Sequence, residues 1–340
     1  MKYVGVDLHK QTISVCVMVE EGAKRRVEQR RGLRCADVEG IRRFFEELGS
    51  FRVVVEATSN YEWFFLLIED LADRCVLAHP KKLRVIAESK QKSDKIDARV
   101  LAEFLLLDMI PEAYRPTPRI RQHRVLVRHR HRVQRQISSL KCKLRHKAAF
   151  YNADIAGLFT ARGLEHLAKI AMSDADRFEC QALQEQLELL RNQRKAVDRE
   201  LKVFAQSAPV AEREARAVLA TVPRFGPVTI DTLLSEAGDV RRFRSAKRIV
   251  AYAGLDPGFR ESAGRSKQLR ITKEGSRLLR WALIEASWRL VLASPRWRRL
   301  FDQLRRSTGH KKKAIVGVAR RLLCVVFALL RNGQAYRLAG

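Results

Sequence analysis

The feature that most constrains the fold is a long basic run in which apolar side chains recur at heptad spacing. No Asp or Glu occurs between residues 113 and 152, while Lys and Arg recur throughout. Apolar positions three and four residues apart lie on one face of a helix. The run therefore predicts a long amphipathic helix with an apolar stripe of Leu126, Val133, Ile137, Leu140 and Leu144, interrupted by Arg130.

A second heptad stretch lies later in the chain and ends before residue 207. Two such stretches favour a helical hairpin, or a coiled coil with another subunit, over two core-facing helices of an ordinary bundle. The second stripe comprises Leu183, Leu187, Leu190, Val197, Leu201 and Phe204, with Arg194 among them.

The first 115 residues have the pattern of an α/β domain. Two β-rich runs separated by a polar turn, followed by the basic run "KRRVEQRR", predict three consecutive strands. A helix over 37–48 precedes "FRVVVEA", a continuous apolar run typical of a buried strand. A helix at "YEWFFLLIEDLA" and a fifth strand at "RCVLAHP" complete the order expected of an RNase H-like sheet.

Two further domains are predicted after this one. Residues 116–206 form the basic helical or coiled-coil segment, and residues 207–340 are expected to be mostly helical. In the latter, "AVLATVPRFGPVTIDTLLSEAG" predicts a helix–turn–helix-like element with a tight Pro/Gly turn. The segment "LDPGFRESAGRSKQ", rich in glycine and cations, is expected to be a loop.

The composition points to a polyanionic partner. The chain has 67 Lys and Arg against 38 Asp and Glu, a formal net charge of +29, yet its 46% hydrophobic content indicates a folded protein. A ribosome-like or architectural protein meets the same criterion, so the charge indicates the partner and not the activity. The segment 119–147 is the best candidate for backbone contacts with RNA or DNA.

The sequence lacks the signatures of several other classes of protein. The six cysteines include no C-x-x-C pair, which excludes common zinc-ligand spacings and favours a reducing, cytoplasmic location. No P-loop, G-x-G-x-x-G or H-E-x-x-H occurs, and the N-terminus has no secretory hydrophobic region. The most apolar late segment is interrupted by Arg320 and Arg321, so we expect a packed helix and no membrane partner.

Four carboxylates are expected to share one site. Asp7 ends the first apolar strand and Glu56 ends the buried strand, so both should meet where parallel strands end. Asp94 and Asp97, in "KSDKIDAR", lie one helical turn apart. Clustered carboxylates call for a hard cation such as Mg²⁺, with Mn²⁺ as the substitute, and paired ions support phosphoryl transfer. Turn caps, a helix N-cap or an arginine pair are the alternative roles.

Several motifs together resemble a known family. "VGVDLHK", "VVVEATSNY", "KSDKIDA" and "YAGLDPGFRESAG", followed by "RITKEGSRLLRWAL", occur in this order and are similar to the "one-ten" family of insertion-sequence transposases. The resemblance covers almost the whole chain. It implies a RuvC-like domain carrying a D-E-D-D set on Asp7, Glu56, Asp94 and Asp97, and a C-terminal transposase domain with a nucleophilic serine at Ser262.

The same resemblance implies an activity and partners. It implies a serine-using DNA recombinase that excises and integrates its element, acting on donor and target DNA with a structured bridge RNA. It also implies dimers that assemble into a tetramer, in a bacterial cytoplasm and associated with the nucleoid. Two departures from the family pattern are Ser59, where glycine is usual, and Pro223-Arg224-Phe225-Gly226 in place of P-G-I-G.

The serine hypothesis rests on its surroundings as well. A serine hydroxyl needs a base or a metal to become a good nucleophile, and the cations around Ser262 could hold a scissile phosphate. By residue type alone, Ser266 is an equal choice, and a turn-forming role is commoner. The predicted nucleic-acid contacts are Lys10, Arg124, Arg128, Arg132, Arg135, Lys141, Arg224, Arg260, Arg265, Lys267 and Arg270.

Three other functions stay open from the residues. A RuvC-like nuclease or junction resolvase would use the carboxylates alone and leave free DNA ends. A site-specific DNA invertase would share the same motifs. A non-enzymatic packaging protein would not need Asp94 and Asp97.

Overall fold

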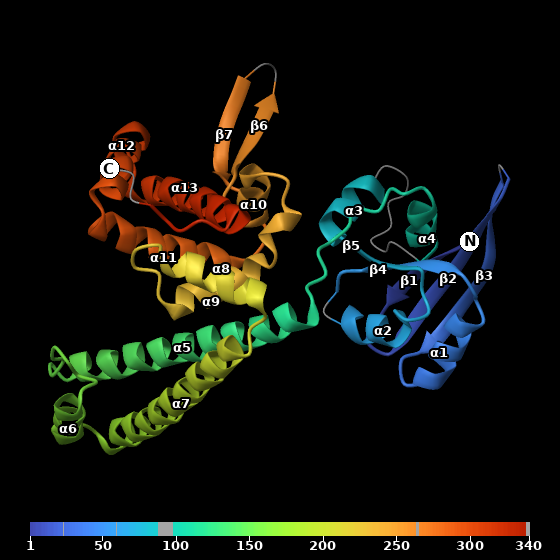
Figure 1. The fold of residues 1–340 in the computed structure, drawn as a ribbon. Coiled ribbons are helices and arrows are strands. Elements are labelled where there is room, and N and C mark those ends of the chain that lie inside the picture. Colours follow the sequence, from blue (N-terminus) through green and yellow to red (C-terminus); the bar gives the residue numbers. More distant parts are fainter. Residues whose placement is uncertain (23, 59, 88–97, 263–264, 338–340) are drawn as a thin grey trace. The chain divides into compact units, whose positions relative to one another are not determined.

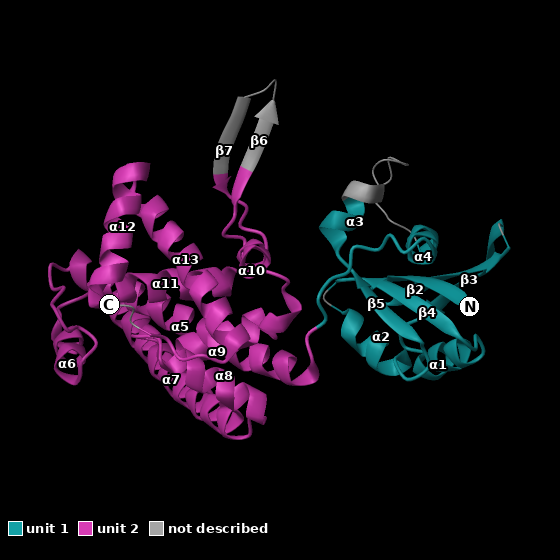
Figure 2. Ribbon diagram, turned by 45° about the horizontal axis from the view of Figure 1, so that its top comes forward, with its two compact units in different colours: residues 1–115 teal, residues 116–340 magenta. Residues whose placement is uncertain are grey.

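The computed structural model describes residues 1–22, 24–58, 60–87, 98–262 and 265–337, with the backbone alone at 85–87, 259–262 and 265–269. The chain divides into two compact units, residues 1–115 and 116–340 (Figure 2). Each unit has a hydrophobic core of its own.

Unit 1 contains a five-stranded mixed sheet in the order β3-β2-β1-β4-β5 (Figure 1). β1, β2 and β3 form an antiparallel meander, while β4 runs parallel to β1 and β5 runs parallel to β4. This order confirms the predicted RNase H-like sheet. The strands are β1 (Lys2–Leu8), β2 (Thr12–Glu21), β3 (Lys24–Arg34), β4 (Phe51–Glu56) and β5 (Arg74–Ala78).

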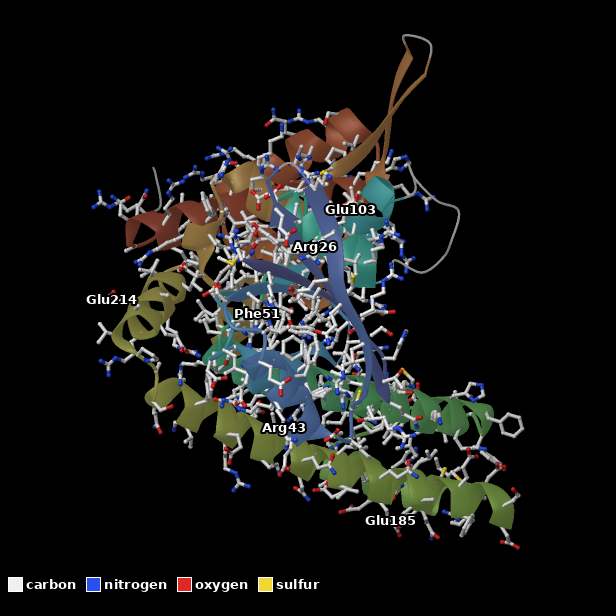
Figure 3. All side chains as sticks on the ribbon, turned by 90° about the vertical axis from the view of Figure 1, so that its right-hand side faces the viewer. Arg26, Arg43, Phe51, Glu103, Glu185 and Glu214 are labelled. Atoms are coloured by element: carbon white, nitrogen blue, oxygen red, sulfur yellow. The ribbon has the colours of Figure 1, made fainter. Side chains whose placement is uncertain are left out.

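Helices cover both faces of this sheet, which explains the continuous apolar run in β4. Val53 and Val55 pack with α1 and α2, together with the fully buried Phe51 (Figure 3). Val54, on the opposite face, packs with Leu101 of α4. A strand covered on both faces needs apolar residues at consecutive positions. The helices are α1 (Val38–Glu46), α2 (Tyr61–Ile68), α3 (Pro80–Ala87) and α4 (Ala98–Leu106).

Unit 2 begins with the predicted helical hairpin, in which α5 (Pro118–Phe150) and α7 (Asp174–Gln206) flank α6 (Ala161–Lys169) (Figure 1). The two intruding arginines form hydrogen bonds across the hairpin, although Arg194 Nε is buried without a hydrogen-bond partner among the described residues. Arg130 donates to Asp198 at 2.5 Å, and Arg194 donates to the side-chain oxygen of Gln134 at 3.1 Å. The buried stripes contain Val133, Ile137, Leu140 and Leu144 of α5 with Leu183, Leu187, Val197 and Leu201 of α7.

The N-termini of the two long helices, α5 and α7, are capped by side chains. Thr117 accepts a hydrogen bond from the backbone nitrogen of Ile120, and Ser173 does the same for Asp176. Each cap satisfies a backbone N–H that has no partner inside the first helical turn. Glu185, on the exposed side of α7, extends away from the hairpin (Figure 3).

The rest of unit 2 is mostly helical, as predicted, around a core that includes Leu283, Leu290 and Leu322. The predicted loop at "LDPGFRESAGRSKQ" is wrong, because its backbone forms an antiparallel β-hairpin. The elements are α8 (Val210–Ala220), α9 (Pro227–Ala237), the 3₁₀ helix η1 (Val240–Arg242), α10 (Ala246–Tyr252), β6 (Pro257–Ser262), β7 (Arg265–Ile271), α11 (Arg277–Ala293), α12 (Pro295–Thr308) and α13 (Lys311–Asn332).

In the part of the chain that is described, no helix is both long enough and apolar enough to cross a membrane.

Candidate active site

Two of the four predicted carboxylates lie at the same edge of the unit 1 sheet. The last registered pair of the parallel strands β1 and β4 is Val6 with Val55. Asp7 and Glu56 are the next residue on each strand, and both side chains are partly exposed. Because the carboxyl ends of adjacent parallel strands form the binding edge of an open α/β sheet, this placement suits a ligand site.

Both carboxylates belong to the face that α4 covers. Gly5, two residues before Asp7, lies against the start of α4, where a Cβ would overlap the carbonyl oxygen of Ala98 and the backbone nitrogen of Ala102. Side chains two residues apart share a face of a strand, so Asp7 faces this side as well. Glu56 shares its face with Val54, which packs against α4.

The second pair of predicted carboxylates, Asp94 and Asp97, lies outside the described residues. Ala98, which directly follows Asp97 in the chain, is the first residue of α4. Ala98 itself lies against Gly5 of β1.

Gly5→Ala is expected to displace α4, because the added methyl group would meet backbone atoms that cannot rotate away. Overpacking of this kind costs about 1–3 kcal/mol of unfolding free energy. Chemical denaturation measures the change, and Gly32→Ala in β3 is the matched control, since nothing lies within 4 Å of a Cβ there. Equal stability of the two variants would show that α4 does not lie tightly on β1.

Two loops beside the carboxylate edge are joined by hydrogen bonds. His9 Nε2 lies 3.1 Å from Asp7 Oδ2, and the Asn60 side chain donates to the carbonyl oxygen of His9 at 3.2 Å. Thr58 donates to Asn60 at 2.8 Å. These bonds connect the loop after β1 to the loop after β4. His9 is not among the site residues predicted from the sequence, although its position two residues after Asp7 in "DLHK" was a usable signal.

A second histidine borders this edge. His79 directly follows β5, whose last residue Ala78 pairs with Glu56. Its Nδ1 is buried and has no hydrogen-bond partner among the residues described. His79 was not predicted from the sequence either, because a single histidine after a strand is not a distinctive pattern.

The donor atoms at this edge fit a hard divalent cation. Asp7 and Glu56 offer carboxylate oxygens, which Mg²⁺ prefers, and no cysteine is adjacent to either in the sequence. Within the described ranges, no group of three or more His, Cys, Asp and Glu side chains could hold a metal ion. Since Asp94 and Asp97 are outside those ranges, the four-carboxylate metal site stays a prediction.

Two of the predicted nucleic-acid contacts on α5 are held by α9. Arg124 donates to the carbonyl oxygens of Ser235 and Glu236, at 2.7 and 3.0 Å. Arg128 forms a bidentate ion pair with the Glu236 carboxylate, donating two hydrogen bonds of 2.7 and 2.9 Å. In this structure, therefore, both arginines fasten α5 to α9; their contact with nucleic acid stays a prediction.

The Glu236 carboxylate depends on this pair. Its side chain is 1% exposed, and burial alone would raise its pKa. The hydrogen bond and charge of Arg128, with smaller contributions from the Ser276 hydrogen bond and the Arg124 charge, together outweigh burial and hold the pKa below its usual value. A depressed pKa means that the stabilisation is present above the ordinary pKa of glutamate and is lost as the pH falls through the folded-state value.

Arg128→Gln is expected to lower the unfolding free energy by about 3 kcal/mol at neutral pH, because it leaves a buried carboxylate without its charged partner. The loss should shrink as the pH falls below the ordinary glutamate pKa. Denaturant titrations at pH 7 and pH 4 measure both effects. Arg132→Gln, at an exposed position one turn along α5, should change stability by less than about 0.5 kcal/mol. Equal effects would contradict a fastening role for Arg128.

The remaining predicted cations of α5 differ in surroundings. Arg132 and Arg135 are exposed, whereas Lys141 lies over the ring of Phe159 with its Nζ 5.0 Å from the centroid. Burial lowers the pKa of Lys141, and the charges of Arg191 and Arg194 lower it further. Lys10, beside the carboxylate edge in unit 1, is exposed.

The turn between α8 and α9 places an arginine in a glycine-like conformation. Arg224 has φ +65°, and its side chain is exposed, while Gly226 has φ −95° and caps α9. An L-residue rarely adopts positive φ because its Cβ crowds the backbone. The departure from the family pattern thus falls at the position where the backbone would favour glycine.

Arg224→Gly is expected to raise the unfolding free energy by about 0.5–1 kcal/mol, since it removes the strain of a left-handed side chain. The same variant should bind DNA more weakly if the guanidinium contacts a phosphate. Thermal unfolding and a DNA titration measure the two effects separately. A stabilised variant with unchanged affinity would leave Arg224 without a binding role.

The backbone of β6 and β7 places the serine region in a hairpin. Ser262 is the last residue of β6 and pairs with Arg265, and Arg260 pairs with Lys267. The side chains of these four residues lie outside the description. Ser266, the alternative nucleophile, pairs with Glu261 through the backbone. Arg270 is exposed near the end of β7.

Two family matches cover separate parts of the chain. Residues 4–152 match a DEDD family named for IS110 and described as "Transposase". Residues 216–302 match the family described as "Transposase IS116/IS110/IS902 family". The first match contains the carboxylate edge and the second contains the β6–β7 hairpin.

Individual relatives agree with these matches. The chain is 27% identical over 155 residues to an IS110 insertion-element protein of Streptomyces coelicolor, covering 46% of this chain and 37% of the relative. It is 32% identical over 124 residues to the pilin gene-inverting protein of Moraxella bovis, covering 35% and 38%. These alignments thus span well under half of either relative.

Another relative aligns from end to end. The chain is 23% identical over 353 residues to a probable family 20 transposase of Pseudomonas aeruginosa, which covers 98% of both chains. The two family matches have the same order as the two structural units, and the sheet has the expected RNase H-like topology. This protein therefore belongs to the IS116/IS110/IS902 family of transposases.

Proposed function

We propose that this protein is an insertion-sequence DNA recombinase that cuts and rejoins DNA through a serine–phosphate intermediate, assisted by a divalent cation at the DEDD edge. The observation that carries the proposal is the placement of Asp7 and Glu56 on one face, at the ends of adjacent parallel strands. Membership of a DEDD transposase family supports the same reading of that edge.

The proposed reaction balances without an external energy source. Ser262 Oγ forms a bond to a DNA phosphorus while one phosphodiester P–O bond breaks, and the released deoxyribose hydroxyl takes up the proton. Attack by a hydroxyl of another strand then reverses the exchange and frees the serine. The serine–phosphate ester keeps the energy of the broken phosphodiester bond for rejoining, whereas hydrolysis would lose that energy.

Separate groups would serve separate parts of this reaction. Asp7 and Glu56 would hold Mg²⁺ through their oxygens, with Asp94 and Asp97 as the further predicted ligands. When bound, the cation supplies charge stabilisation at the reacting phosphate. His9, paired to Asp7, orients that carboxylate, and the cations Arg260, Arg265, Lys267 and Arg270 would hold the DNA backbone beside the serine.

The partners follow from charge and from the resemblance. A net charge of +29 suits binding to donor and target DNA and to a structured bridge RNA. Assembly of dimers into a tetramer through the α5–α7 hairpin is part of the same proposal. So is a location in the bacterial cytoplasm, in association with the nucleoid.

DNA inversion is the second candidate, favoured by the likeness to the Moraxella protein, whose name describes it as inverting a pilin gene. Inversion and transposition use the same bond exchange and differ in the arrangement of the DNA sites. Supplying paired sites in direct and inverted orientation, and sequencing the products, separates the two.

The chemistry is tested by mapping the covalent intermediate. Full-length protein, Mg²⁺ and the DNA that flanks its gene are stopped with detergent, digested with nuclease and protease, and examined by mass spectrometry. We expect a nucleotide-bearing peptide modified at Ser262. An adduct at Ser266 would move the nucleophile by four residues, and free 5′-phosphate ends without an adduct would favour a hydrolytic nuclease.

A further inference from the structure

The helix pair at one end of unit 2 carries a dense set of exposed cations. Residues 296–313 contain five arginines and three lysines but a single acid, Asp302. These residues belong to α12 and the beginning of α13, which lie side by side (Figures 1 and 2). We name as the α12–α13 cation surface the exposed residues Arg298, Arg299, Arg305, Arg306, Lys312 and Lys313.

Packing decides which side of α12 faces outward. Trp297 and Phe301 are 3% exposed and belong to the same core as Ala314 and Ile315 of α13. Arg299 and Arg306 lie on the opposite side of α12, and Arg298 and Arg305 lie on its flank, so the four form two neighbouring pairs that are seven residues apart. A hydrophobic anchor on one side thus holds a cationic side in a constant orientation.

Among the described residues, no carboxylate neutralises these cations. None of the six forms an ion pair within the described part of the chain. On α5, by contrast, Arg119, Arg128 and Arg130 pair with carboxylates of other helices. A solvated set of like charges repels itself, and a polyanion would relieve that repulsion.

The spacing suits a regular phosphate array. Seven residues of helix span about 10.5 Å at a rise of about 1.5 Å per residue. The phosphates of one DNA strand rise by about 3.4 Å each along the duplex axis while the strand winds around it. The pair Arg298–Arg299 and the pair Arg305–Arg306 are therefore far enough apart to contact different phosphates of the duplex backbone without any base contact.

We propose that the α12–α13 cation surface binds the phosphate backbone of duplex DNA, independently of sequence. The inference rests on the proposed function and extends it, because none of the six residues of this surface is among the nucleic-acid contacts predicted from the sequence. Its role is to hold the duplex, and the residues of the surface take no part in the chemistry.

The test compares two variants that lose the same charge. In the first, Arg298, Arg299, Arg305 and Arg306 are replaced by Gln. In the control, four exposed cations on α7 and α8 are replaced by Gln: Lys195, Arg199, Lys202 and Arg213. Both full-length variants are titrated with a fluorescent random-sequence duplex at several salt concentrations, and circular dichroism checks that they are folded.

We expect the first variant to bind the duplex at least tenfold more weakly than wild type. The slope of log affinity against log salt concentration should become shallower by about one for each phosphate contact removed. The control should stay much closer to wild type in both measurements. Equal losses in both variants would reduce the effect to net charge and overturn the proposal. Weaker binding of a hairpin RNA with unchanged duplex binding would overturn it too. Normal duplex binding in a variant that still forms the serine adduct would reject this surface and leave the proposed function standing.

Discussion

Asp7→Asn is expected to lower the rate of DNA strand cleavage by roughly 10²–10³-fold, which is the scale seen when one charge-stabilising group is removed from an active site. The substitution keeps the size of the side chain and removes the negative charge that a divalent cation needs. Its effect on stability should be below about 1 kcal/mol, because the Asp7–His9 pair is partly exposed to solvent. Gel analysis of end-labelled DNA gives the rate.

Matched substitutions distinguish a catalytic role of Asp7 and Glu56 from the general effect of removing one carboxylate. Glu56→Gln should have an effect of similar size, whereas Glu39→Gln, at an exposed position of α1, should have none. A chelator should stop cleavage in the wild type and leave duplex binding in place. Undiminished cleavage in both carboxylate variants would refute a catalytic DEDD edge.

Ser262→Ala is expected to abolish the covalent protein–DNA adduct and to lower strand exchange on the order of 10³-fold or more, because no other oxygen would form the phosphate ester. Duplex affinity should stay within about twofold of the wild-type value. The adduct is quantified by gel shift after protein denaturation, and strand exchange by sequencing of joined products.

The neighbouring serine provides the control. Ser266→Ala changes the same kind of side chain in the same hairpin and should keep the adduct. If Ser262→Ala retains the adduct and Ser266→Ala loses it, the nucleophile is Ser266. If both retain it, the intermediate does not use this hairpin.

Local patterns were enough to predict most of the architecture. The strands of unit 1 follow from apolar runs between polar turns, and the buried strand at "FRVVVE" could be recognised because both of its faces are covered. The α5–α7 hairpin follows from heptads that bury one face of each helix. The β6–β7 hairpin could not be recognised, since polar and cationic residues over much of its length give no apolar alternation.

The acidic residues of the candidate site could be predicted from the sequence, but the contacts that hold the elements around them in place could not. Asp7 is the second-last residue of β1 and Glu56 is the last residue of β4, so their position at one edge follows from strand order. The contact of Gly5 with α4 and the bond from Asn60 to His9 depend on how separate elements pack. Neither contact changes the local sequence pattern in a recognisable way.

The sequence by itself determined the strands of unit 1 and most of the helices, which acids lie at the carboxyl ends of the parallel strands, and that the chain is strongly basic. Only the tertiary structure decided which cations are neutralised within the protein. Arg128 meets Glu236, 108 positions away in the chain, while the arginines of α12 have no such partner among the described residues. Periodicity arises from neighbours along one element, whereas an ion pair between distant elements depends on their packing, and a local pattern does not record it.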